Sequence, residues 1–281
     1  MPTLYLSPST QDWNQYVTGS GSEELWMNRL ADAMAPYLNS CGIRYVRNTP
    51  EMTAGSSVRQ ANQGWYDFYL ALHSNAAAGE AAGKARGIIA FYYPTSTEGQ
   101  RAAQIFVNNL RTIYPLPNAV ITRSTTTLGE IRYSKFPTVL LEIGYHDNVE
   151  DAHWIEDNIP LIAQNIVLAL TEYFDIPFIW PTDPWETAVF TEGGGNLNLR
   201  AKPSMEAQVV GSIPNGSMVR VYGRYEDWYV VRYKDQVGYA SAKYIYRYHI
   251  RGWGIPRKDG SCCFYLFSCA VFVQYHLTED R

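Results

Sequence analysis

The sequence predicts an α/β domain, with a mostly parallel sheet flanked by helices, followed by a small all-β barrel. Residues 1 to 178 alternate short apolar runs with amphipathic stretches, which is typical of βαβ units. From residue 188 to 248 the pattern changes to short alternating runs separated by turn signals such as Pro214-Asn215-Gly216. The chain has 281 residues, 46% of them hydrophobic, and is therefore long enough to bury both cores.

The elements of the first region follow from their periodicity. Strands are predicted at the short apolar runs 3–6, 43–46, 67–73, 87–93, 119–122 and 138–143. Helices are predicted over 22–39, 99–112 and 161–174, where apolar residues recur at helical spacing. Ser22 is a suitable N-cap for the first helix, and Pro36 predicts a kink or an early end within it.

The prolines and tryptophans of residues 177 to 185 indicate a linker after the first core. We therefore predict one domain over 1–178, a linker over 179–187, a second domain over 188–248 and a tail over 249–281. The apolar stretch 262–275 of the tail is shorter than the roughly 20 residues that span a bilayer, so no clear membrane span is predicted. The sequence predicts no function for the tail.

Charge and cysteine content narrow the function classes. The net charge of −4 and the pI near 5.8 argue against nucleic acid as a partner, and no dense Lys/Arg run is present. Cys41 is isolated and the other cysteines cluster near the C-terminus, which predicts no disulfide framework and a reducing compartment. No secretory signal is visible at the N-terminus.

Two polar residues interrupt apolar strands of the first region. His73 ends the run Tyr69–His73, and Glu142 follows Val139-Leu140-Leu141. Ligands of open α/β sheets bind at the carboxyl ends of strands, where both residues are predicted to lie. A buried carboxylate or imidazole is costly without a partner, so each position calls for a cation or a hydrogen-bond network.

The sequence around these residues resembles a known protein family over most of residues 3–176. The matching segments are Leu6-Ser7-Pro8, Glu24 with Asn28 one turn later, Leu72-His73-Ser74-Asn75-Ala76, and Phe136-Pro137-Thr138-Val139-Leu140-Leu141-Glu142-Ile143-Gly144-Tyr145. Together they resemble the zinc-dependent N-acetylmuramoyl-L-alanine amidases of bacteria, phages and spore-formers. The resemblance implies Glu24 and His73 as Zn²⁺ ligands and Glu142 as the general base that acts on zinc-activated water.

One departure from the family leaves the third ligand open. The family usually has Asp-Pro-Gly-His where this chain has Ser7-Pro8-Ser9-Thr10-Gln11, so the first histidine ligand is missing. Gln11 offers a carbonyl oxygen and His146 an imidazole nitrogen. On ligand softness we favour His146 over Gln11. Arg47 and Asn75 are further candidates for binding the substrate.

The second region resembles the bacterial SH3-like domains of cell-wall enzymes. The resemblance rests on the run Asn196–Ser204, on Val210–Gly216, and on Trp228 and Gly238-Tyr239. It implies a module that concentrates the enzyme on peptidoglycan. Trp228 and Tyr239 are candidates for its binding face, and Trp228 is the more suited of the two to the barrel core.

The expected function is hydrolysis of the amide between N-acetylmuramic acid and the L-alanine of the stem peptide. Two alternatives stay open: a zinc peptidase that cuts within the stem peptide, and a wall-binding protein with a degenerate amidase domain. The expected partner is peptidoglycan, and the sequence assigns no oligomeric state. Without a visible signal, we expect a cytoplasmic protein that reaches the wall on release, as a lysin does, or a chain whose leader is missing.

Overall fold

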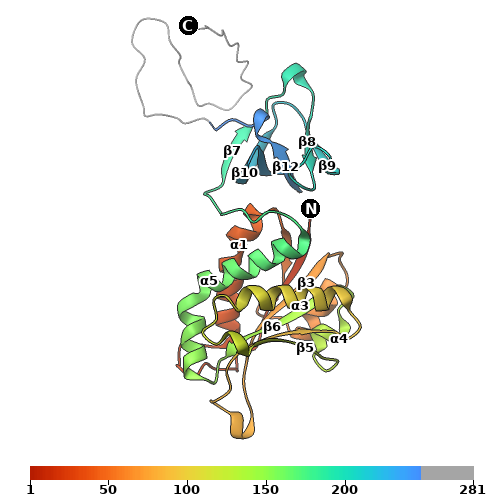
Figure 1. Cartoon of the computed structure of the whole chain (residues 1–281). Coiled ribbons are helices and arrows are strands. Elements are labelled where there is room, and N and C mark those ends of the chain that lie inside the picture. Colours follow the sequence, from red (N-terminus) through yellow and green to blue (C-terminus); the bar gives the residue numbers. More distant parts are fainter. Residues whose placement is uncertain (248–281) are drawn as a thin grey trace, which may run out of the picture. The chain divides into compact units, whose positions relative to one another are not determined.

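The structure is a computed structural model, and it describes residues 1–247. Its first part contains a six-stranded sheet in the order β2-β1-β3-β6-β4-β5 (Figure 1). The strands are β1 (Thr3–Pro8), β2 (Arg44–Arg47), β3 (Phe68–Asn75), β4 (Ile88–Tyr92), β5 (Val120–Ser124) and β6 (Thr138–Tyr145). All neighbours pair in parallel except β4 and β6, which are antiparallel. The predicted mostly parallel sheet is confirmed.

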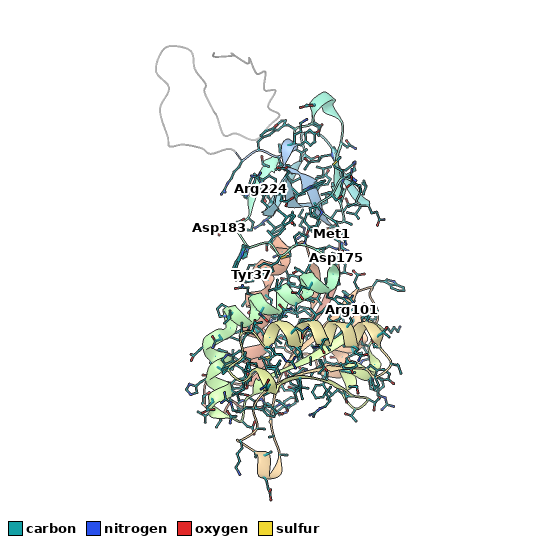
Figure 2. All side chains as sticks on the ribbon, in the orientation of Figure 1. Met1, Tyr37, Arg101, Asp175, Asp183 and Arg224 are labelled. Atoms are coloured by element: carbon teal, nitrogen blue, oxygen red, sulfur yellow. The ribbon has the colours of Figure 1, made fainter. Side chains whose placement is uncertain are left out.

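Helices cover both faces of this sheet, as Figure 1 shows. They are α1 (Glu23–Ser40), α2 (Ala54–Ala61), α3 (Thr97–Leu110), α4 (Gly129–Tyr133) and α5 (Val149–Phe174). The main core packs α1, α3 and α5 against one face, while α2 and α4 cover the other through residues such as Val58 and Ile131. Arg101, labelled in Figure 2, ties α3 to the end of α5 by donating to the Tyr173 carbonyl.

The strands alternate between the two faces, and this alternation decides where each site residue points. Leu70 and Leu72 of β3 belong to the core under α1 and α5, whereas Tyr69 and Ala71 belong to the core under α2 and α4. His73, the next odd position, therefore points to the α2 and α4 side. The site is built on that side of the sheet.

Prolines affect the helices differently from the prediction. Ser22 caps α1 as expected, with its side chain accepting from the Leu25 amide, but the helix continues through Pro36 to Ser40, so the predicted early end is wrong. The last helix begins at Val149 instead of near residue 161. Asn158 leaves the helical conformation inside it, two residues before Pro160, which explains why periodicity alone reveals only the second half.

The second part is an all-antiparallel sheet in the order β7-β10-β11-β12-β8-β9 (Figure 1). Its strands are β7 (Trp185–Ala188), β8 (Leu197–Arg200), β9 (Val209–Ile213), β10 (Met218–Tyr225), β11 (Trp228–Tyr233) and β12 (Gln236–Ser241). The predicted small all-β domain is confirmed, with β7 beginning inside the predicted linker. Within residues 1–247 no helix is both long and apolar enough to cross a membrane. The predicted tail and its apolar stretch lie outside the described residues.

Candidate active site

A cavity of about 380 Å³ opens at the carboxyl ends of β1, β3 and β6, on the side of the sheet that α2 and α4 cover. Its lining includes Gln11, His73, Glu130 and Glu142, with the exposed ring of Trp13 among the lining residues. His73 and Glu142 are paired positions on the parallel strands β3 and β6, so their side chains share one face. The predicted meeting of strand-end polar groups is therefore present.

His73 is held by a carboxylate on each side of its ring. Nδ1 lies 2.8 Å from Oε1 of Glu23, and Nε2 lies 2.8 Å from Oε2 of Glu130. All three side chains are buried. Burial opposes a charge on the ring, but the hydrogen bonds and charges of the two carboxylates raise the pKa of His73 well above its usual value. The imidazole is thus the positive centre of an acidic cluster.

Glu23 begins α1, directly after the N-cap, where the helix places it against His73. Oε2 of Glu23 also accepts from Nδ2 of Asn14 at 2.7 Å. Burial raises the pKa of this carboxyl, but the hydrogen bond and the charge of His73 outweigh it, and the pKa is lowered overall. Glu23 therefore carries its negative charge toward the His73 ring.

Glu24, the predicted ligand, does not occupy this place. Successive helical residues point about 100° apart, so Glu23 and Glu24 cannot both face His73. The carboxyl of Glu24 has Asp12 and Glu51 as its charged neighbours. The residue that meets His73 is Glu23, one position earlier.

Glu142 differs from the other carboxylates of the site because one of its oxygens has no partner. Oε2 is buried and makes no hydrogen bond. Burial raises the pKa of Glu142 from 4.5 to about 7, which the nearby charge of His73 only partly opposes. An unpartnered buried oxygen on a cavity wall indicates a polar group that belongs beside it.

His146, the favoured third ligand, lies on the opposite face of the sheet from His73. Its Nδ1 contacts Oγ of Ser74 at 3.0 Å, and Ser74 follows His73 in the strand and so points the other way. The ring stacks on Tyr16, which belongs to the core under α1. His146 therefore does not reach the cavity, and the preference for it is corrected.

Gln11, the alternative, does lie in the cluster. Its Nε2 is 3.4 Å from Nδ1 of His73 and 3.5 Å from Oε1 of Glu23. Its Oε1 accepts from Nδ2 of Asn14 at 3.3 Å. The amide of Gln11 is thus the third polar group beside the Glu23 and His73 pair.

The remaining predicted residues lie away from the cavity lining. Arg47 binds Asp32 through Nη1 at 2.5 Å and Asn28 through Nη2, which draws its guanidinium to the outer face of α1. The backbone carbonyl of Asn75 accepts from the His146 amide. In the second domain Trp228 is half-buried, and Tyr239 is fully buried with its hydroxyl donating to the Cys41 carbonyl. Tyr239 therefore presents no surface to a ligand.

Comparison with known proteins identifies the families of the two domains. The family model described as N-acetylmuramoyl-L-alanine amidase matches residues 11–172, more than half of the chain. The chain belongs to this amidase family. A bacterial SH3 domain model matches residues 195–246. The search among curated proteins returned no match.

Solved amidases share the fold of the first domain. An N-acetylmuramoyl-L-alanine amidase of Nostoc punctiforme, AmiC2, is 16% identical with a TM-score of 0.55, covering 62% of this chain and 97% of that one. The catalytic domain of CwlV from Bacillus (Paenibacillus) polymyxa is 18% identical with a TM-score of 0.55, covering 63% and 100%. The amidase of Clostridium difficile 630 is 19% identical with a TM-score of 0.55, covering 62% and 97%.

The donors of this amidase fit a divalent cation, but not through two histidines. Within residues 1–247 no three His, Cys, Asp or Glu side chains form a metal site. Four-coordinate ligands at about 2.0–2.2 Å from zinc stand roughly 3.3–3.6 Å from one another. The Gln11 amide stands 3.4 and 3.5 Å from His73 and Glu23, whereas Nδ1 of His73 and Oε1 of Glu23 are hydrogen-bonded at 2.8 Å and would have to separate by about 0.5 Å around an ion. A half-turn of that amide exchanges its nitrogen for the carbonyl oxygen, and it gives up the long hydrogen bonds of Gln11 with Asn14 and Glu23.

Sequence reasoning missed Glu23, Glu130 and Trp13. Glu23 is the acidic neighbour of the predicted Glu24, and only the helix phase separates them. Glu130 stands in the short helix α4, which no periodicity reveals because it has only five residues. Trp13 follows Gln11 closely and stays 68% exposed while it lines the cavity, which is a signal that only the structure supplies.

Proposed function

We propose that the cavity hydrolyses the amide between the lactyl group of N-acetylmuramic acid and the L-alanine of the stem peptide. The family supports peptidoglycan amidase activity. The observation that carries the proposal within the chain is Glu142, a half-buried residue whose Oε2 is buried without a partner on the wall of the cavity that His73 also lines. A pKa of about 7 suits a group that must accept and then return a proton near neutral pH.

Glu142 acts as the general base in this proposal. It takes a proton from the attacking water while the water oxygen bonds to the lactyl carbonyl carbon. The bond from this carbon to the alanine nitrogen then breaks, and Glu142 returns the proton to the leaving amine. The products are the muramoyl carboxylic acid, which then loses its proton to the solvent, and a stem peptide with a free N-terminal alanine amine, so atoms and protons balance.

Gln11, Glu23 and His73 are the residues that would hold Zn²⁺. When bound, the ion would supply Lewis-acid polarisation of the amide carbonyl and a lowered pKa of the attacking water. Glu23 contributes the negative charge and His73 the nitrogen donor. The Gln11 oxygen replaces the histidine of the family motif, and this harder donor weakens the preference for zinc relative to a two-histidine site.

The second domain supports the same reaction by holding the chain on its polymer. An SH3-like module that binds the wall raises the effective concentration of scissile bonds without adding chemistry. The exposed ring of Trp13 at the cavity offers a flat apolar surface for a sugar ring or a peptide side chain.

The test is Glu142→Gln on purified peptidoglycan with zinc present. Loss of a general base slows hydrolysis about 10²- to 10⁴-fold, so release of stem peptides should fall by that factor. Glu24→Gln is the matched control, because it makes the same change at a carboxyl that does not line the cavity and should leave release unchanged. Equal release by wild type and Glu142→Gln would overturn the assignment of the base.

The products also separate the alternatives. Mass spectrometry of the digest should show intact stem peptides that begin with L-alanine. Fragments cut within the stem would favour the zinc peptidase. The wall-binding alternative is favoured by one observation, the missing first histidine, and it predicts that the wild-type chain binds the wall, retains no zinc and releases nothing.

A further inference from the structure

Glu130 is a buried carboxylate to which the general-base reaction gives no role. It lies on α4, far in sequence from His73, and lines the same cavity. Its Oε1 accepts from Oγ of Ser7 at 2.6 Å and from the Tyr69 hydroxyl at 2.7 Å. Its Oε2 faces Nε2 of His73 at 2.8 Å. Three donors from two strands thus fix this carboxylate in one orientation.

The contact with His73 determines which ring nitrogen is free for a cation. A neutral imidazole has one N–H donor and one acceptor nitrogen. Glu130 accepts only, so Nε2 must donate its hydrogen to Glu130. Nδ1 also faces a carboxylate, Oε1 of Glu23 at 2.8 Å, so in the absence of a cation it carries a hydrogen too. A cation held by Glu23 would take the place of that hydrogen and use the Nδ1 lone pair, while Nε2 stays bound to Glu130. A carboxylate behind a histidine is the arrangement that orients metal-binding imidazoles and increases their basicity.

The charge around His73 also favours a bound cation. Glu23, Glu130 and Glu142 surround one imidazole, and no Lys or Arg is among the residues of the described chain that line the cavity. The two carboxylates in contact with this single positive ring, Glu23 and Glu130, leave an excess of negative charge in a buried place, which a divalent cation would offset.

Ser7 links Glu130 to the departure of this chain from the family motif. The family usually has an aspartate where Ser7 stands, and Ser7 donates to Oε1 of Glu130. An aspartate at this position would set a second carboxylate against Glu130, which is unfavourable in a buried site. A serine at position 7 is therefore compatible with Glu130 where an aspartate is not.

We propose that Glu130 is a positioning residue of the cation site, which holds the Nε2 hydrogen of His73 and so directs Nδ1 toward Gln11 and Glu23. This inference rests on the proposed function, because it concerns the cation that the reaction uses. In this role Glu130 acts on the cation through His73 and is not itself a ligand.

The experiment measures the Zn²⁺ dissociation constant by titration calorimetry for the full chain and its variants. Glu130→Ala removes the partner of Nε2 and should weaken binding about 10- to 100-fold, the usual effect of losing such a partner. Glu130→Gln keeps an acceptor oxygen for Nε2 and should lose less than Glu130→Ala. Ile131→Val, the next residue of α4 and also buried, is the control for helix packing and should bind zinc as wild type does.

A second measurement reads the histidine directly. In the zinc-loaded, ¹⁵N-histidine-labelled chain, His73 should show a slowly exchanging Nε2 hydrogen resonance, assigned by its loss in His73→Gln. The resonance should be absent in Glu130→Ala. Thermal unfolding of each variant shows whether the chain is folded. If Glu130→Ala does not fold, Glu130→Gln takes its place in both measurements.

The outcomes separate this inference from the proposed reaction. Zinc affinity that is unchanged in folded Glu130→Ala and Glu130→Gln would overturn the positioning role, even if the wild type hydrolyses peptidoglycan. Zinc affinity that depends on Glu130 in a wild-type chain that releases no stem peptide would overturn the reaction and support the positioning role. A wild-type chain that binds no zinc would overturn both.

Discussion

Two buried acidic sites of the first domain show how a structural carboxylate differs from a functional one. Asp151, in the first turn of α5, has both oxygens fully used: Oδ1 accepts from Arg86 and Tyr114, and Oδ2 from the amides of Gly87 and Tyr145. Glu142 lies near the end of β6, the strand that precedes α5, and its Oε2 is buried and unpartnered. Asp151 thus has both oxygens engaged in holding elements together, whereas Glu142 keeps one oxygen open on the wall of the proposed active site.

The largest effect is expected where the satisfied carboxylate is changed. Asp151→Asn removes a charge whose partners include the guanidinium of Arg86, and breaking a buried pair of this kind costs about 3–5 kcal/mol. Urea unfolding should show that loss. Asp32→Asn breaks the ion pair with Arg47, in which Asp32 is 72% exposed, and should cost less than about 1 kcal/mol. Equal losses in the two variants would contradict the comparison.

The carboxylate of Glu142, unlike that of Asp151, should lower the stability of the folded chain when it is ionised. Its pKa of about 7 in the folded chain, against 4.5 as its ordinary value, corresponds to roughly 3 kcal/mol. Because the folded pKa is the higher one, this stability is present below pH 4.5 and is lost as the pH rises through 7. Glu142→Gln has no ionisable group at this position. The free energy of unfolding of the zinc-free variant should therefore rise relative to that of the zinc-free wild type between pH 4.5 and 8. A difference that is constant with pH would contradict the burial of an ionisable Glu142.

The choice between Glu23 and Glu24 gives the next effect. Glu23→Ala removes a proposed ligand and should weaken Zn²⁺ binding about 100-fold, by analogy with the loss of groups that support metal sites. Glu24→Ala, adjacent in sequence, should bind as wild type does because its carboxyl has Asp12 and Glu51 for charged neighbours. Calorimetric titration of both variants shows whether Glu23 or Glu24 faces the ion. The reverse order would restore the original assignment.

The smallest effect concerns the rim of the cavity. Trp13→Ala removes a ring that is 68% exposed, and the loss of an aromatic contact of about 1 kcal/mol should raise KM for peptidoglycan roughly fivefold with kcat unchanged. Trp65→Ala is the control, since Trp65 is 92% exposed and does not line the cavity. A change in kcat without a change in KM would exclude substrate contact by Trp13.

Much of the architecture could be predicted because it depends on local patterns. The apolar runs that become β1 to β6 and the N-cap at Ser22 are visible in the sequence, and the structure places them as expected within a few residues. The helices α2 and α4 were missed, since each is too short to show a period. Glu130 was missed with α4, and its relation to His73 depends on residues 57 positions apart.

The site illustrates where local reasoning stops. The sequence alone determined that a histidine and a glutamate lie near the carboxyl ends of two apolar strands, because each interrupts a run of apolar residues. Only the tertiary structure decided that these strands are neighbours and that His73 and Glu142 are paired positions on one face. Only the tertiary structure decided that Glu23 meets His73, that His146 lies behind the sheet and that Gln11 lies in the cluster. The physical reason is geometric: a shift of one residue turns a helical side chain by about 100° and moves a strand side chain to the other face. Motif spacing finds the neighbourhood of such a residue, and packing decides which side chain enters the cavity.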